Sequence, residues 1–114
     1  MGESGELLQG TLEMLVLKAL SLEPMHGWGI GQRIDQLARG AFTVPQGSLY
    51  PALQRMLRKS LIRSEWRRTE NNRRARYYLI TRTGKAQLEA ETEEWQRTSR
   101  AVNAILRTAT ADGL

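Results

Sequence analysis

The sequence contains no cysteine and only one histidine among its 114 residues. The missing cysteines exclude disulfides and thiolate metal ligands, and a single histidine cannot form a histidine-based metal site. The carboxylates offer little more, because four glutamates between residues 89 and 94 are spaced as the solvated face of a polar helix rather than as an acid–base pair. We therefore expect no metal and no cofactor, and an enzyme is the least favoured class of protein.

Long hydrophobic runs are missing as well. The most apolar stretch, residues 14–22, is interrupted by Lys18 and is far too short to span a membrane. The first ten residues lack the charged start and the apolar segment of a secretory signal. These absences predict a soluble cytoplasmic protein without membrane association, and the length suits one domain.

Positive charge is present and is concentrated in one segment. The formal net charge is +5, but residues 55–76 alone hold nine arginines and lysines against two glutamates, which makes this segment +7 and leaves −2 for the rest. A basic surface on an otherwise nearly neutral chain is typical of a protein that binds a polyanion such as DNA. The alternative is an ordinary solvated surface rich in arginine.

The spacing of apolar residues predicts a first helix over residues 7–22. Leu12 and Leu15 lie on one apolar stripe, while Met14 and Leu17 lie off it. A small protein has difficulty burying a helix that is apolar on two faces, so we expect one face to pack against a second chain. Leu12 and Leu15 are accordingly candidates for a dimer core or for the lining of an effector site.

Two further helices are predicted over residues 27–37 and 47–60, joined by a short loop. The later one begins with GSLYP, and its buried stripe consists of Leu49, Leu53, Met56 and Leu57. Ser48 is the expected N-cap. This puts Pro51 in the first helical turn, where its missing N–H costs no hydrogen bond.

A β-hairpin and a long helix complete the prediction. Residues 61–67 and 75–81 are the expected strands, joined by the Asn-rich turn RTENNRR. Thr81 is the expected cap of a helix over residues 82–108, in which Leu88, Trp95, Val102 and Ala109 recur every seven residues as a weak heptad. The predicted fold is mainly α with a small β-hairpin (α+β). It is a winged helix-turn-helix domain over residues 7–81 and a C-terminal dimerisation helix over 82–108, with flexible tails at 1–6 and 109–114.

This arrangement predicts binding to double-stranded DNA. The third helix can enter a major groove with its N-terminus first, while the hairpin wing brings arginines to the adjacent backbone. The free N–H groups at the helix start favour phosphate. The candidate DNA-contacting residues are Ser48, Tyr50, Pro51, Gln54, Arg55 and Arg58 on the third helix, Arg67, Arg68, Arg73 and Arg74 on the wing, and His26 at the start of the second helix.

Each candidate also has a simpler structural interpretation. Tyr50 could belong to the core, Ser48 could only cap its helix, and the polar residues that follow could form a solvated face. His26 could be a turn residue. A wing arginine such as Arg76 could stack on the neighbouring Tyr77 instead of contacting DNA.

Four blocks of the sequence together resemble the PadR-like transcriptional regulators. They are LLQGTLEMLVLKAL, PMHGWGI, GSLYPALQRMLRKSLI and RRARYYLITRTGKAQL, and they span residues 7–88. The resemblance implies a winged helix-turn-helix repressor that binds a palindromic operator as a homodimer, paired through its first and last helices. It also implies that Ser48, Tyr50 and Pro51 lie at the groove-facing start of the recognition helix and that the tip of the wing approaches the DNA backbone.

The resemblance further implies a candidate effector site. In drug-responsive members of the compact subfamily, which this short chain resembles, a tryptophan on the last helix stacks on flat ligands between subunits. Trp95 is the matching residue. It would bind a small hydrophobic or aromatic effector, or else it would only fill the dimer core. A winged-helix module that binds protein without specific DNA binding is the alternative function.

Overall fold

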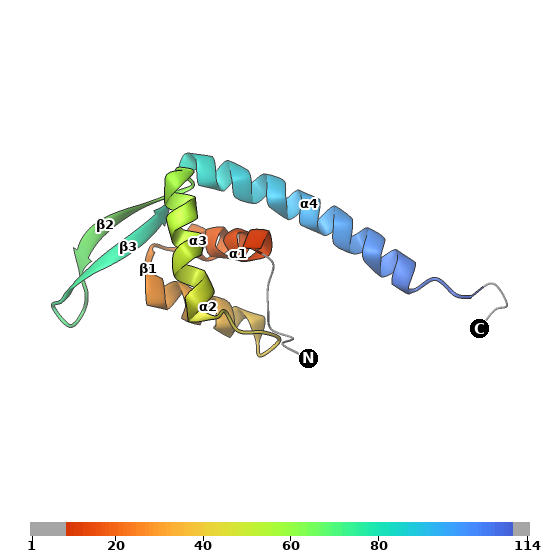
Figure 1. Cartoon of the computed structure of the whole chain (residues 1–114), viewed down its shortest axis with the longest axis horizontal. Helices are drawn as coiled ribbons and strands as arrows, with labels where there is room; N and C mark the ends of the chain where they lie inside the picture. Colours follow the sequence, from red (N-terminus) through yellow and green to blue (C-terminus); the bar gives the residue numbers. More distant parts are fainter. Residues whose placement is uncertain (1–8, 111–114) are drawn as a thin grey trace.

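The computed structural model describes residues 9–110, so the predicted tail at 1–6, the first two residues of the expected first helix and residues 111–114 lie outside the described part. Four helices and a small antiparallel sheet make up the described chain, which confirms the predicted α+β class (Figure 1). In chain order the elements are α1 (Gln9–Leu22), β1 (Met25–His26), α2 (Gly27–Ala38), α3 (Gln46–Arg58), β2 (Ile62–Arg68), β3 (Arg74–Ile80) and α4 (Arg82–Leu106).

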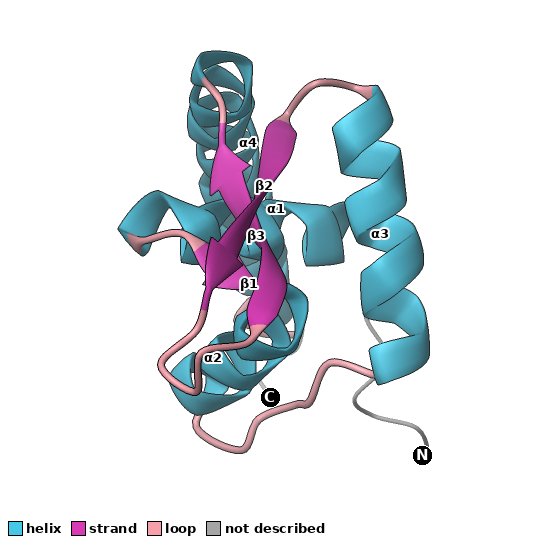
Figure 2. Cartoon of the chain, turned by 90° about the vertical axis from the view of Figure 1, so that its left-hand side faces the viewer, coloured by secondary structure: helices cyan, strands magenta, loops and turns pink. Residues whose placement is uncertain are grey.

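The sheet has three strands in the order β1-β3-β2, one more than the sequence predicts. The hairpin of β2 and β3 is confirmed, with Ile62 opposite Ile80 and Arg68 opposite Arg74. The additional strand, β1, is only two residues long and pairs Met25 with Tyr78 on the other edge of β3. Two residues are too few to show an alternating pattern, and the segment before α2 was therefore expected to be only a break. Figure 2 shows the three strands together, with α3 beside them.

The core lies between α1, α2, α3 and the sheet. Its fully buried side chains include Val16, Leu17, Ile30, Leu53, Met56 and Ile62. Leu12 belongs to this same core and is only 3% exposed, which corrects the expectation that it faces a second chain or an effector. The α1 stripe at Leu12 is covered within the protomer, because α1 contacts α2, α3, α4 and the sheet, whereas Leu15 is only partly buried.

The start of α3 differs from the prediction. The helix begins at Gln46 with Pro45 as its N-cap, and Ser48 is its third residue, with its N–H bonded to the Pro45 carbonyl at 3.0 Å. Ser48 is therefore not the cap, and Pro51 lies in the second turn rather than the first. The loop before the helix is fixed from α2 instead, because the Val44 N–H donates to an Asp35 carboxylate oxygen at 2.8 Å.

Pro51 removes the N–H that would bond to the carbonyl of Gly47, four residues earlier. The helix tolerates this loss because both residues are exposed, so water can satisfy the free carbonyl.

The long helix α4 begins as expected at its cap. The Thr81 hydroxyl accepts from the Gly84 N–H at 2.9 Å, and Gly84 packs against the backbone of Leu61. The helix ends at Leu106 rather than at Thr108, whose hydroxyl donates to the Ala104 carbonyl at 2.9 Å. The first part of α4 contacts α1, and its far end projects away from the domain (Figure 1). Within residues 9–110, no helix is both long enough and apolar enough to cross a membrane.

Candidate nucleic-acid interface

Two helix starts lie close together on the side of the domain next to the wing. At α2, His26 is the N-cap, and its Nδ1 accepts from the Gly29 N–H at 3.0 Å. Because Nδ1 is an acceptor, the proton of the neutral ring is on Nε2, where it can be donated outward. At α3, no side chain caps the helix. Its first N–H groups therefore need an external acceptor, such as water or a phosphate.

The predicted contact residues on α3 do not all share one environment. Ser48, Tyr50 and Pro51 are exposed at the start of the helix, and Arg58 is exposed at its end. Tyr50 is 60% exposed, which excludes its interpretation as a core residue. Gln54 is half-buried between them.

Arg55 differs from these residues because its side chain is engaged by an acidic residue of the same protomer. Its Nε donates to a carboxylate oxygen of Glu13 on α1 at 2.8 Å, and Lys59 reaches the other oxygen at 3.4 Å. The Glu13 side chain is only 9% exposed, so this pair is screened from water. The sequence places Arg55 on the outer face of α3, whereas in the structure its guanidinium binds Glu13 and holds α3 against α1.

Part of the positive charge on the wing is neutralised within the wing. Glu65 accepts from Arg67 at 2.6 Å and from Arg63 at 3.2 Å. The hydrogen bond from Arg67, followed by that from Arg63 and the positive charge of both, lowers the pKa of Glu65, although its partial desolvation opposes the shift. Glu65 therefore stays ionised at neutral pH and offsets about one positive charge on this face of the hairpin.

The arginines nearest the turn of the wing have other partners. Arg68 donates to the carbonyl and the side-chain oxygen of Asn72, at 3.3 and 2.9 Å. Asn72 has a left-handed backbone with φ of 60°, and this bond stabilises the turn. The guanidinium of Arg74 stacks over the ring of Trp66, with 4.9 Å from Cζ to the ring centroid.

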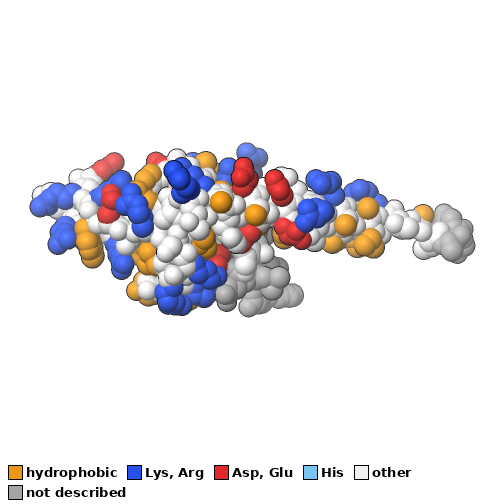
Figure 3. Space-filling model, turned by 90° about the horizontal axis from the view of Figure 1, so that it is seen from above, with side chains coloured by type: hydrophobic (Ala, Val, Ile, Leu, Met, Phe, Trp, Pro, Cys, Tyr) orange, Lys and Arg blue, Asp and Glu red, His pale blue; other side chains and the backbone are white. Residues whose placement is uncertain are grey.

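Within the basic segment 55–76, five arginines have no acidic partner among residues 9–110. They are Arg58 at the end of α3 and Arg68, Arg73, Arg74 and Arg76 on the wing. Figure 3 shows basic side chains gathered at the end of the molecule that the wing forms. This surface presents unpaired positive charge beside two helix N-termini, which is the electrostatic arrangement of an anion-binding face.

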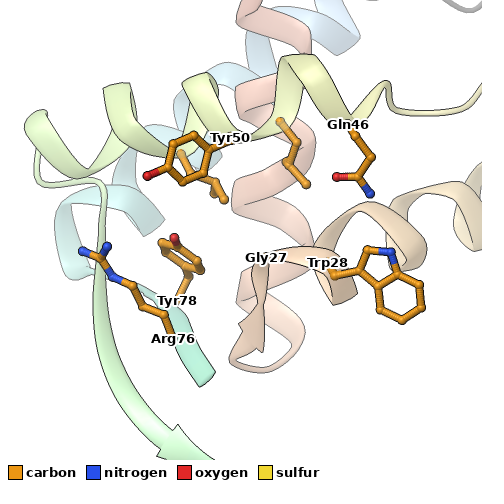
Figure 4. Close-up of a pocket in the computed structure, with 8 residues that line it drawn as sticks. Gly27, Trp28, Gln46, Tyr50, Arg76 and Tyr78 are labelled. Carbon is orange, nitrogen blue, oxygen red and sulfur yellow. The ribbon is translucent and has the colours of Figure 1, made fainter. Parts of the chain in front are cut away.

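A hollow of roughly 230 Å³ opens between the starts of α2 and α3 and the strand β3. Figure 4 shows it bordered by Trp28, Gln46, Tyr50, Arg76 and Tyr78. Trp28 is 61% exposed and is not among the contact residues predicted from the sequence. Its position off the apolar stripe of Ile30 and Ile34 is the signal that could have identified it.

Tyr78 forms part of the floor of this hollow. The residue is buried, and its burial raises the pKa of the phenol above the ordinary value of 10.0. The hydroxyl therefore stays protonated at neutral pH. Since it makes no hydrogen bond within residues 9–110, it is available as a donor to a bound group.

The residues expected to bind an effector or to form a dimer core are not brought together. Trp95 is 52% exposed and borders a hollow of about 210 Å³ with Gly10, Thr11 and Met14 of α1. Leu15 borders a separate apolar hollow with Leu37 and Phe42, between α1 and α2. No group of three or more potential metal-ligating side chains occurs in residues 9–110.

Comparison with known proteins identifies similar chains. Residues 16–90 match the model of the transcriptional regulator PadR-like family. The PadR-like transcriptional regulator of Bacillus cereus is 32% identical and superposes with a TM-score of 0.79, over 89% of this chain and 96% of that one. A PadR family transcription regulator from Clostridium difficile is 28% identical with a TM-score of 0.74, over 85% of this chain and 99% of that one. A 37.1 kDa protein in a transposon of Streptomyces fradiae is 37% identical over 87 residues, which cover 76% of this chain but only 24% of that protein.

Proposed function

Because this chain belongs to the PadR-like family of DNA-binding transcriptional regulators, we propose that it binds a palindromic operator as a homodimer and represses the adjacent promoter. The start of α3 enters the major groove in each half-site, and the wing lies along the neighbouring backbone. Within this proposal, Ser48, Tyr50 and Pro51 face the bases.

One observation carries the proposal. Two helix N-termini, the exposed aromatic side chains of Trp28 and Tyr50, and Arg76 of the wing all border the same hollow. Such a surface combines phosphate-binding groups with side chains that can contact base edges. Arg55 is left out of the DNA contacts, because Glu13 already engages it.

Selection of bound fragments from random DNA, using the purified protein, tests the function directly. We expect enrichment of a palindrome whose half-sites lie about one helical turn apart. If each protomer releases counterions through Arg58, Arg73, Arg74 and Arg76, a dimer binds with a slope of log K against log salt of about −7. Failure to enrich any sequence, or a slope near zero, would contradict specific DNA binding.

Two substitutions separate affinity from specificity. Replacing Arg73 and Arg74 with alanine is expected to lower the affinity for operator DNA and for random DNA by the same factor, because phosphate contacts do not depend on sequence. Tyr50→Ala is expected to reduce the ratio between the two affinities instead. Fluorescence anisotropy measures the ratio of operator to random-DNA affinity for each variant. If Tyr50→Ala leaves the ratio unchanged, Tyr50 is not a specificity residue.

We base the homodimer on the apolar side chains that α4 leaves uncovered. Val102, Ile105 and Leu106 are 46–75% exposed at the far end of this helix, and Trp95 is exposed beside α1. Burying these side chains against a second copy removes apolar surface from water. Light scattering should give twice the protomer mass for the native chain. A variant with Ile105→Glu and Leu106→Glu should give the protomer mass, and a dimeric variant would exclude this end of α4 from the interface.

We propose a small hydrophobic effector at Trp95 as a further property of the dimer. Its indole offers a flat face, and Glu91 and Glu94 border the same hollow, which favours a planar aromatic cation. Titration calorimetry with proflavine tests this, and Trp95→Ala is expected to lose the binding. Trp66→Ala serves as the matched control, because it removes an equally exposed indole on the wing.

A further inference from the structure

We propose that the hollow between Trp28, Tyr50 and Tyr78 receives the 5-methyl group of a thymine in each operator half-site. The inference rests on the DNA binding proposed above and adds which base the start of α3 recognises. It assigns Trp28, on α2, as a specificity-determining residue together with Tyr50 on α3.

The first argument is the apolar character of the hollow. Leu49, Leu53 and Tyr78 form its floor and are all buried, while the rings of Trp28 and Tyr50 stand at its rim with more than half of their surface in water. Covering such exposed rings with an apolar group removes apolar surface from water and makes binding more favourable. The only apolar group that a base pair presents in the major groove is the methyl group of thymine.

The size of the hollow agrees with this occupant. Its volume of roughly 230 Å³ exceeds that of a methyl group, so the edge of the base can enter with it. Gly27 contributes to this opening, because a Cβ at this position would lie 3.7 Å from Leu53 and 3.8 Å from Tyr78 and would occupy part of the space.

The second argument is the polar chemistry beside the apolar surface. Thymine presents its O4 acceptor next to the methyl group. The hollow supplies donors for this oxygen in the protonated Tyr78 phenol and the side-chain amide of Gln46. Its lining contains no carboxylate, the side chain that best accepts from the amino group of cytosine.

Arg76 can fix the position of the recognised base relative to the DNA backbone. It borders the hollow, and its Nε donates to the Ser64 hydroxyl at 2.9 Å. This bond holds the guanidinium in place while its terminal N–H groups stay available for a phosphate near the recognised base.

Substitution of single thymines by deoxyuridine tests the inference. Deoxyuridine keeps the base pair and O4 and removes only the methyl group. In the operator obtained by selection, we expect one position in each half-site where this change weakens binding about 4-fold, and about 15-fold when both half-sites are changed. At the same position, 5-methylcytosine should bind better than cytosine.

Protein variants locate the methyl contact. Trp28→Ala and Tyr50→Ala should bring the ratio of thymine to deoxyuridine affinity at this position close to one, whereas Tyr50→Phe, which keeps the ring, should preserve the ratio. Arg74→Ala is the matched control, because it should weaken both operators equally and leave the ratio unchanged. Circular dichroism verifies that each variant folds. If an alanine variant does not fold, Tyr50→Phe still provides a folded variant for which the thymine-to-deoxyuridine ratio is predicted.

The outcomes separate the inference from the function on which it rests. Specific operator binding that is insensitive to every single methyl group overturns the inference alone. A methyl effect that survives in both Trp28→Ala and Tyr50→Ala also overturns it, because the contact then lies elsewhere. A protein that selects no operator contradicts the proposed function, and the inference falls with it.

Discussion

Gly84 is the position where a single methyl group should disturb the fold most. A Cβ at this position would lie 2.1 Å from the Leu61 carbonyl oxygen and 2.9 Å from Cγ1 of Ile80. Carbon and oxygen normally approach to about 3.3 Å, so Gly84→Ala must displace the start of α4 by about 1.2 Å. The carbonyl belongs to backbone and cannot turn away as a flexible side chain can.

This displacement breaks the interactions that attach α4 to the domain. The Thr81 N–H donates to the Leu61 carbonyl at 3.1 Å. The Thr81 hydroxyl shares its proton between the carbonyls of Ser60, at 2.7 Å, and Leu61, at 3.0 Å, and it accepts from the Gly84 N–H at 2.9 Å. Three such bonds contribute about 3 kcal/mol, and alanine regains about 1 kcal/mol through its higher helix propensity. We therefore expect Gly84→Ala to lower the free energy of unfolding by about 2 kcal/mol.

Urea denaturation followed by circular dichroism measures this change. All variants must be compared at one protein concentration, because a dimer's stability depends on concentration. Gly10→Ala is the matched control: a Cβ at this helical glycine meets nothing within 4 Å outside its own helical turn, so we expect no loss and a gain of about 1 kcal/mol from helix propensity. If Gly84→Ala unfolds at the same urea concentration as the native chain, the close packing at Leu61 is not required.

Three further predictions follow from the charges and the buried phenol. Glu65→Gln should release its two arginine partners and steepen the salt slope on random DNA by up to about 2 per protomer, measured by anisotropy; an unchanged slope would mean that these arginines do not reach phosphate. Glu13→Gln should cost about 2 kcal/mol in urea denaturation by leaving Arg55 without its counter-charge, and the added substitution Arg55→Met should recover part of this loss. Tyr78, whose pKa is raised by burial, should ionise at a higher pH in the folded chain than in the urea-unfolded chain in an absorbance titration, and Tyr78→Phe should remove this difference. Since ionisation is disfavoured in the folded state, the free energy of unfolding should fall as the pH rises above about 10.

The elements with strong local patterns were predictable from the sequence. The apolar stripe of α3, the turn between β2 and β3 and the cap at Thr81 all depend on residues that are near one another in the chain. Such spacing fixes the type of each element, because a helix or a hairpin buries one face whatever it packs against.

What the sequence could not reveal depends on contacts between distant residues. Arg55 was expected to face DNA because it follows the buried stripe, but its partner Glu13 lies 42 residues earlier and on another helix. Leu12 was expected at an interface because α1 is apolar on two faces, but the structure buries Leu12 and Leu17 within one protomer. Neither the Arg55–Glu13 contact nor the burial of Leu12 can be predicted from the spacing of residues near them in the chain.

The start of α3 was mispredicted for a different reason. Ser48 is a better N-cap by residue type than Pro45, and local propensity therefore selected it. In the structure, the bond from Val44 to Asp35 fixes the entering chain from outside the helix, so no capping side chain is required. The helix can then begin at Gln46, with its N-cap three residues before the predicted one.

The three tryptophans are all exposed, by 61%, 60% and 52%, and each lies in a different surface: Trp28 beside α3, Trp66 on the wing and Trp95 on α4. An indole in water emits at longer wavelength than a buried one, and a stacked base quenches it. Variants that retain one tryptophan therefore turn the intrinsic fluorescence into three separate reporters. Trp28 should respond to base contact, Trp66 to docking of the wing, and Trp95 to subunit pairing with a shift to shorter wavelength, so the order of these events on an operator can be timed without any added label.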